Sequence, residues 1–89
     1  MNNPDITPKS LWRVGNNQHR VVIFVQDKQV FYAGRGGNVL NPFGPGENCS
    51  IDTFLKKGRH IGEVKEAEWK QVQNDLAPWI VANKESDKD

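Results

Sequence analysis

Two apolar runs, Val21–Val25 and Val30–Ala33, form the most hydrophobic stretch of the chain and lie close together in the sequence. Their β-branched and aromatic residues favour strands over helices. The polar segment Gln26–Gln29 separates the two runs, with Asp27 and Lys28 at its centre. This pattern predicts a β-hairpin, although Asp-Lys is a weaker turn signal than Asn-Gly or Asp-Gly.

The predicted hairpin also defines a register and an environment. The residues expected to face each other across it are Val25 with Val30, Phe24 with Phe31, and Ile23 with Tyr32. The first run does not alternate between apolar and polar residues, which is typical of a strand that is covered on both faces. An isolated hairpin is marginally stable in water, so further strands or helices must pack on it.

An earlier strand is expected at Ser10–Val14, where the residues alternate and place Trp12 on the opposite face from Leu11. The segment Gly15–Gln18 follows as a turn. Together with the hairpin, this strand predicts a three-stranded antiparallel meander.

A short helix is expected at Ser50–Gly58 because Ser50 is a good N-cap and Gly58 suits a left-handed residue at the C-terminal end. The segment Arg59–Val64 is interpreted as a short strand or extended link, with Ile61 and Val64 buried.

The main helix is expected at Lys65–Ala82, with Pro78 breaking or kinking it near Leu76 and Ala77. Its apolar stripe has helical spacing and predicts the cover for the second face of the hairpin. The residues at these positions are Trp69, Val72, Leu76, Trp79, Ile80 and Asn83.

The segment Arg35–Asn48 is rich in Gly and Pro and predicts a long irregular loop. Loops of this length in small domains are usually functional or disordered. We expect it to anchor a protein partner, with Phe43 at the centre, Val39 and Leu40 beside it, and Arg35 at the rim. The alternative, weighted equally, is a packed loop that closes one end of the sheet.

These elements indicate an α+β fold: a three-to-four-stranded antiparallel meander with a short helix and a C-terminal amphipathic helix packed on it. An SH3-like, partly open barrel is the leading architecture, and a plain meander with two packed helices is the runner-up. We expect one domain at residues 10–83, between a disordered N-terminal tail at 1–9 and a disordered, mixed-charge tail at 84–89.

Charge changes this picture because it is unevenly distributed. Net charge is only +1, but residues 1–60 hold eight Lys and Arg against four Asp and Glu, whereas residues 61–89 hold four against seven. The sheet half is therefore basic, which permits nucleic-acid binding, while a solvated surface is the simpler explanation. The candidate contact residues are Arg13, Arg20, Lys28, Arg35, Lys56, Lys57 and Arg59, with Trp12, Phe31 or Tyr32 as stacking partners if they are exposed.

Catalytic and metal-binding patterns are weak. Cys49, His19 and His60 lack the spacing of zinc ligands, and Cys49 is more simply a packed residue beside a helix cap. The segment Gly34–Gly37 fits no phosphate-binding motif. We therefore expect no enzyme activity, no metal and no cofactor.

The sequence thus predicts a small, non-enzymatic protein-binding module, a regulator or inhibitor that acts through loop 35–48. The alternative is a nucleic-acid-binding domain that uses the basic sheet half. No segment is long and apolar enough to span a membrane, and the N-terminus does not resemble a secretory signal. We expect a cytoplasmic location, and a homodimer is compatible with the sequence.

Overall fold

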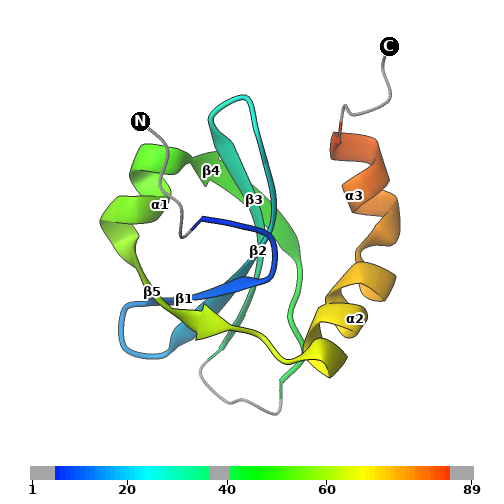
Figure 1. Ribbon diagram of the computed structural model, residues 1–89, viewed down its shortest axis with the longest axis horizontal. Helices are drawn as coiled ribbons and strands as arrows, with labels where there is room; N and C mark the ends of the chain where they lie inside the picture. The colour runs from blue at the N-terminus through cyan, green and yellow to red at the C-terminus, as the bar shows by residue number, and fades with distance from the viewer. Residues whose placement is uncertain (1–5, 37–40, 85–89) are drawn as a thin grey trace.

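An antiparallel sheet organises the computed structural model, which describes residues 6–36 and 41–84. The sheet contains five strands in the order β4-β3-β2-β1-β5 (Figure 1). These strands are β1 (Ser10–Val14), β2 (Gln18–Gln26), β3 (Gln29–Gly36), β4 (Gly46–Ser50) and β5 (Gly58–Glu63). The predicted α+β class and antiparallel meander are confirmed, but the sheet has more strands than the three or four expected.

The tip of the β2–β3 hairpin is a two-residue turn. Asp27 and Lys28 have φ values of 54° and 65°, and they lie between the paired residues Gln26 and Gln29. Two consecutive residues with positive φ are the signature of a type I′ turn, whose twist matches that of the flanking strands. The sequence therefore located the hairpin correctly even though neither tip residue is glycine.

A β-bulge at Ile23 makes one predicted pairing wrong. Phe24 does face Phe31, but Tyr32 faces Val22, and Ile23 is the additional residue between them. A bulge shifts the alternation of the strand by one position. Ile23 and Phe24 consequently belong to the same hydrophobic cluster, while Val22 belongs to the other.

The two faces of the sheet carry separate clusters, as the unalternating apolar run predicted. One cluster packs under helices α2 (Glu66–Asp75) and α3 (Ala77–Asn83), and the other packs under α1 (Ile51–Lys57) on the opposite side (Figure 1). The first contains Val21, Ile23, Phe24, Phe31, Ala33, Phe43, Val64 and Val72. The second contains Ile6, Trp12, Val22, Val30, Tyr32 and Phe54. Ile6 is thus buried, although the sequence placed it in a loose tail.

The end of the predicted loop forms part of β4. Gly46, Glu47 and Asn48 pair with β3 at the edge of the sheet, whereas the sequence suggested irregular structure up to Asn48. Gly46 is tolerated because it lies at the start of an edge strand, where the ring of Trp79 covers it. The predicted irregular segment is therefore replaced by a strand from Gly46 onwards.

Helix α1 begins as predicted but ends differently. The Ser50 hydroxyl accepts a hydrogen bond from the Thr53 backbone N–H at 3.1 Å, so Ser50 is the N-cap. Gly58 has φ −112° and ψ 159°, which is extended rather than left-handed. The chain enters β5 directly at this point. A side chain at Gly58 would come within 3.1 Å of the Phe54 carbonyl oxygen, so close packing explains the glycine.

The prediction for β5 was half right. Val64 is buried, but Ile61 is 46% exposed. Trp12 pairs with His60 and Leu11 pairs with Gly62, which leaves Ile61 at an irregularity in the ladder. The sequence could not reveal this second bulge because it depends on how β5 meets β1.

The C-terminal helix is interrupted where Pro78 predicted. Helices α2 and α3 are separate, and Leu76 between them has φ −108° and ψ 11°. Pro78 lies in the first turn of α3, where a missing backbone N–H has no cost to the helix. Trp69 and Trp79 pack against the first cluster, as expected. The helices in the described residues lack the length and apolar character needed to cross a membrane.

Candidate binding surfaces

Phe43, the predicted centre of a partner-binding loop, is packed inside this chain. It is 3% exposed and belongs to the cluster under α2 and α3. Its backbone N–H donates to Gln71 Oε1 at 3.0 Å, and Gln71 Nε2 donates to its carbonyl oxygen at 3.1 Å. These paired hydrogen bonds tie the loop to α2, so Phe43 fits the packed-loop alternative rather than an exposed anchor.

Arg35, the predicted rim residue, is also directed inwards. Its guanidinium carbon lies 4.3 Å from the centroid of the Phe43 ring, and its Nη1 donates to Glu68 Oε2 at 2.7 Å. Only 4% of the Arg35 side chain is exposed. Burial alone would raise the pKa of Glu68, but the hydrogen bonds from Arg35 and the Lys65 backbone outweigh it and lower that pKa. Arg35 is therefore a buried residue of β3 that contacts Phe43 in the loop and whose charge is compensated by Glu68 on α2.

Val39 and Leu40, the other two predicted contact residues, lie outside the described residues. Their role in binding a protein stays a prediction. Asn41, which follows Leu40, is held in place, because Arg35 Nη1 also donates to its carbonyl oxygen at 3.5 Å.

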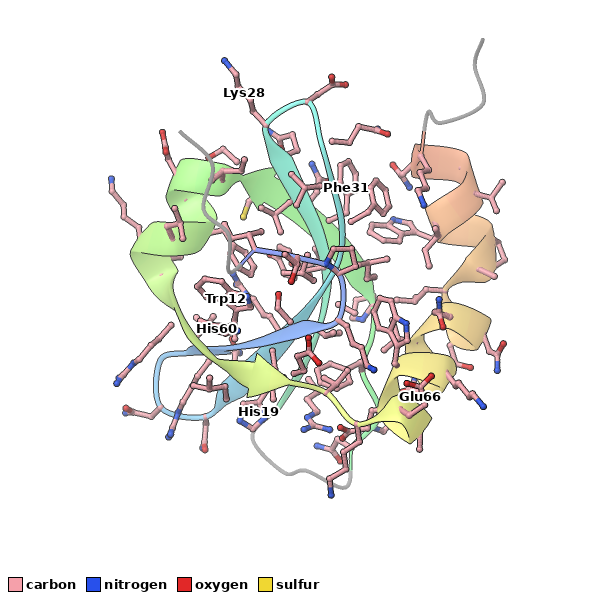
Figure 2. The ribbon with its side chains drawn as sticks, in the orientation of Figure 1. Trp12, His19, Lys28, Phe31, His60 and Glu66 are labelled. Atoms are coloured by element: carbon pink, nitrogen blue, oxygen red, sulfur yellow. The ribbon has the colours of Figure 1, made fainter. Side chains whose placement is uncertain are left out.

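The predicted basic residues do not form one surface. Lys28 occupies the hairpin tip, at the opposite end of the sheet from His19 (Figure 2). Arg13 and Arg59, however, are direct cross-strand neighbours on β1 and β5, and Arg13 also faces His19 on β2. Because directly paired residues lie on the same face, these side chains share one face at this end of the sheet. We call Arg13 and Arg59 the arginine pair.

The arginine pair carries uncompensated charge. Arg13 and Arg59 are exposed, and neither forms an ion pair in the part of the chain that the structure describes. Arg13 Nη2 donates only to the neutral carbonyl oxygen of Asn16, at 2.8 Å. Burial, Arg35 and Arg13 lower the pKa of His19 from the ordinary value of 6.5, so the neutral form of this neighbour predominates at pH 7. Lys57 is exposed at the end of α1, two positions before Arg59, and Lys56 precedes it.

The predicted stacking residues are buried. Trp12, Phe31 and Tyr32 are 3%, 8% and 5% exposed, so they belong to the core, which the sequence had favoured. Trp12 lies beside His60 and Phe54, inside the molecule rather than on a surface (Figure 2). These aromatic rings cannot serve as a platform for nucleic-acid bases.

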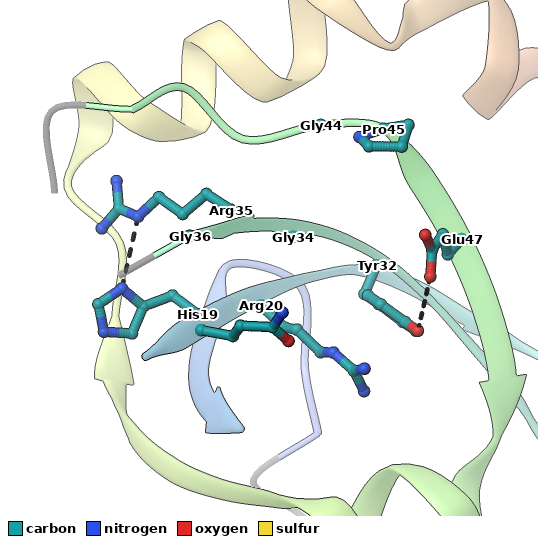
Figure 3. A pocket seen from close by; sticks show the side chains of 10 residues that line it. His19, Arg20, Tyr32, Gly34, Arg35, Gly36, Gly44, Pro45 and Glu47 are labelled. Carbon is teal, nitrogen blue, oxygen red and sulfur yellow. Dashed lines mark hydrogen bonds between the residues drawn. The ribbon is translucent and has the colours of Figure 1, made fainter. Parts of the chain in front are cut away.

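A cleft of about 230 Å³ opens between β2, β3 and the start of β4 (Figure 3). Its lining includes the side chains of His19, Arg20, Tyr32, Arg35, Pro45 and Glu47. The Arg20 guanidinium carbon lies 4.5 Å from the centroid of the Tyr32 ring. The Tyr32 hydroxyl donates to Glu47 Oε1 at 3.2 Å. Arg20 was one of the basic candidates predicted from the sequence. Tyr32 as a wall of this cleft and Glu47 were not predicted, because their proximity depends on the pairing of β3 with β4.

Cys49 is half-buried on β4, and burial raises the pKa of its thiol. A raised pKa disfavours the reactive thiolate, which agrees with the packed role that the sequence suggested. Within residues 6–36 and 41–84, no three His, Cys, Asp or Glu side chains are grouped so that they could hold a metal ion. Comparison with protein-family models, curated proteins and solved structures finds no match for this chain.

Proposed function

We propose that this protein is a non-enzymatic, cytoplasmic nucleic-acid-binding module that contacts backbone phosphates through the arginine pair. The observation that carries the proposal is the direct pairing of Arg13 with Arg59 without a neutralising carboxylate in the described residues. Like charges directly opposite each other in a sheet are destabilising. An anionic ligand that binds between them would relieve this repulsion.

The chemistry of arginine supports phosphate as the ligand. A guanidinium group presents several N–H donors in a planar fork that matches the oxygens of a phosphate. Lys57 and Lys56, two and three positions before Arg59 in the chain, extend the positive charge beyond the pair. Since the aromatic candidates are buried, recognition would use phosphates and not base stacking. This favours duplex nucleic acid, which has a high phosphate density, and little dependence on base sequence.

We also infer an SH3-like, partly open barrel as the architecture of the module. The strand order, which returns β5 to the side of β1, supports this assignment. Helix α1 spans the opening between the edge strands β4 and β5 and contacts both. The cluster around Trp12, Val22 and Phe54 would then fill the barrel interior.

The test measures binding of a fluorescent 20-base-pair duplex by anisotropy between about 50 and 200 mM salt. Wild-type affinity should fall steeply with salt. Each of Arg13→Gln and Arg59→Gln should weaken binding and reduce the slope of log K against log salt by about 1. Lys28→Gln is the matched control, because it removes one exposed positive charge at the other end of the sheet. Equal losses in all three variants, or no binding at low salt, would overturn the proposal.

A protein-binding module that acts as a regulator or inhibitor through loop 35–48 is the second candidate. It is favoured by the anchoring of the loop, in which Gln71 holds Phe43 and Arg35 holds Asn41. Rigidly supported loops commonly carry binding residues. If so, the wild-type protein should capture a protein partner from a lysate that has been treated with nuclease. The double variant Val39→Asp with Leu40→Asp should abolish this capture without changing thermal stability. Phe43→Ala should instead cost about 3–5 kcal/mol of stability, as truncations of buried Phe do.

A further inference from the structure

The cleft beside β4 contains a positively charged group that is held in position. Arg20 is half-buried, and its guanidinium lies over the Tyr32 ring at 4.5 Å from the centroid. No carboxylate of the described residues is within ion-pair distance of it. Stacking on an aromatic face restricts the side chain while leaving the N–H groups at the edge of the guanidinium available. An arginine arranged in this way is prepared to bind an anion.

Among the described residues that line the cleft, Arg20 is the arginine whose charge no carboxylate compensates. Arg35 reaches the lining as well, but its charge is already compensated by Glu68 at 2.7 Å. His19 adds little positive charge at pH 7, because burial and the neighbouring Arg35 and Arg13 lower its pKa from the ordinary value of 6.5. A single available guanidinium matches one phosphoryl group better than it matches a run of phosphates.

The opposite side of the cleft supplies an acceptor. Within the described residues, Glu47 accepts one hydrogen bond, from the Tyr32 hydroxyl at 3.2 Å. A carboxylate can accept several hydrogen bonds, so Glu47 can also accept from a ligand hydroxyl. Arg20 and Glu47 contact the same tyrosine, one at the ring face and the other at the hydroxyl, as Figure 3 shows. A complementary ligand therefore carries an anion and a hydroxyl donor close together.

The walls and the size of the cleft are compatible with such a ligand. Gly34, Gly36 and Gly44 line it, so part of the wall is bare backbone that a ligand can approach closely. Its volume of about 230 Å³ is several times the roughly 30 Å³ that one water molecule occupies in the liquid. There is space for a phosphoryl group with an attached sugar.

We propose that this cleft binds a nucleoside monophosphate unit, with the phosphoryl group on Arg20 and a sugar hydroxyl donating to Glu47. The proposal rests on the proposed nucleic-acid-binding function. The same chemistry is presented by the 5′-phosphorylated end of a bound strand and by a free nucleotide. The arginine pair would hold the strand, and the cleft would hold its end.

The first experiment titrates isotope-labelled protein with adenosine monophosphate, adenosine and inorganic phosphate while backbone amide spectra are recorded. Adenosine monophosphate should bind best and shift the amides of Gly34, Gly36 and Gly44. Arg20→Gln should weaken its binding about tenfold or more, as loss of a charge-assisted hydrogen bond does. Glu47→Gln should weaken the binding of adenosine monophosphate severalfold without affecting the binding of inorganic phosphate. Lys28→Gln should change the binding of neither ligand.

Three results would overturn the cleft proposal. These are no binding of adenosine monophosphate, equal affinity of Arg20→Gln and wild type for adenosine monophosphate, or equal affinity of the wild type for inorganic phosphate and adenosine monophosphate. Arg20→Gln also removes a contact with Tyr32. If it does not fold, Arg20→Lys replaces it as the test. Lysine retains the charge but lacks the planar fork, so it should still weaken nucleotide binding severalfold.

The second experiment compares duplexes with 5′-phosphate and 5′-hydroxyl ends. If the duplex with 5′-phosphate ends binds severalfold more tightly, and Arg20→Gln abolishes this preference, the ligand of the cleft is the phosphorylated strand end. Nucleotide binding without this preference identifies the free nucleotide. If the duplex binds through Arg13 and Arg59 but neither ligand depends on Arg20, the cleft proposal fails and the proposed function stands. If the nucleotide binds but no duplex does, the proposed function fails and the cleft stands.

Discussion

Single residues decide how the edge of the sheet meets α3, and Gly46 is the clearest case. A Cβ atom at this position would lie 2.6 Å from the Trp79 ring. Gly46→Ala should therefore displace the tryptophan and destabilise the protein by about 1–3 kcal/mol, the usual cost of overpacking. Urea denaturation followed by tryptophan fluorescence measures the effect. Gly36→Ala is the control, because its Cβ atom would be 3.6 Å from the nearest described side chain, an ordinary contact.

Glu68 should make stability depend on pH. Its folded-state pKa is lowered from the ordinary value of 4.5, so its ion pair stabilises the folded state above that value. The contribution is lost as pH falls through the lowered pKa, because protonation removes the charge. The stability difference between wild type and Glu68→Gln should be largest near neutral pH and shrink below pH 4.5.

Denaturation midpoints of both proteins between about pH 3 and pH 7 measure this difference. Glu66→Gln is the control, since Glu66 pairs with Lys9 at the surface, where the side chains are 63% and 30% exposed. Solvent screens such pairs, so its effect should be smaller. A wild-type advantage over Glu68→Gln that does not change with pH would contradict this role of the ion pair.

The burial of some individual residues could not be predicted from the sequence. The burial of Phe43 depends on Gln71, 28 positions away, and the exposure of Ile61 depends on a bulge opposite β1. Apolar residues in a Gly- and Pro-rich segment have no local periodicity that indicates which way they face. By contrast, the opposite orientations of Leu11 and Trp12 followed from strict alternation and were predicted correctly.

At the scale of elements, the hairpin turn contains backbone strain that a substitution can relieve. Asp27 and Lys28 both have positive φ, a conformation that glycine adopts more easily than lysine. Lys28→Gly should therefore stabilise the protein by about 0.5–1 kcal/mol, the balance between relieved strain and a more flexible unfolded chain. Thermal and urea denaturation measure the gain. Gln29→Gly, one position later and in β3, should instead destabilise, because glycine weakens a strand interior.

Elements whose signals are local were predicted well. The Ser50 cap, the break before Pro78 and the β2–β3 hairpin each depend on residues within a few positions of one another. β4 was missed because Gly46–Ser50 has little apolar character and becomes a strand only by pairing with β3. The cleft was missed for the same reason, since β4 brings Glu47 to Tyr32.

At the scale of the molecule, the centre of the sheet is buried between two hydrophobic clusters, one on each face. Val21 on β2 belongs to one cluster, Val22 on β2 and Val30 on β3 belong to the other, and all three are 0% exposed. Helix α3, in contrast, contains no buried residue, and Val81 on it is 76% exposed. Resistance to local opening grows with buried apolar contact. The centre of the sheet should therefore be the most stable part of the fold and α3 the least stable helix.

Native-state hydrogen exchange tests this ranking. Amides in the middle of β2 and β3 should exchange only by global unfolding, so their exchange free energy should equal the free energy of unfolding from denaturation. Amides of α3 should exchange with a clearly lower free energy of opening. This helix, which includes Trp79, can separate from the sheet while the sheet remains folded. Helix α1 is the internal comparison, because it has the same length as α3 but contains the fully buried Phe54. If α3 exchanges as slowly as β2, the partly buried Trp79 and Ile80 suffice to join it to the global unit.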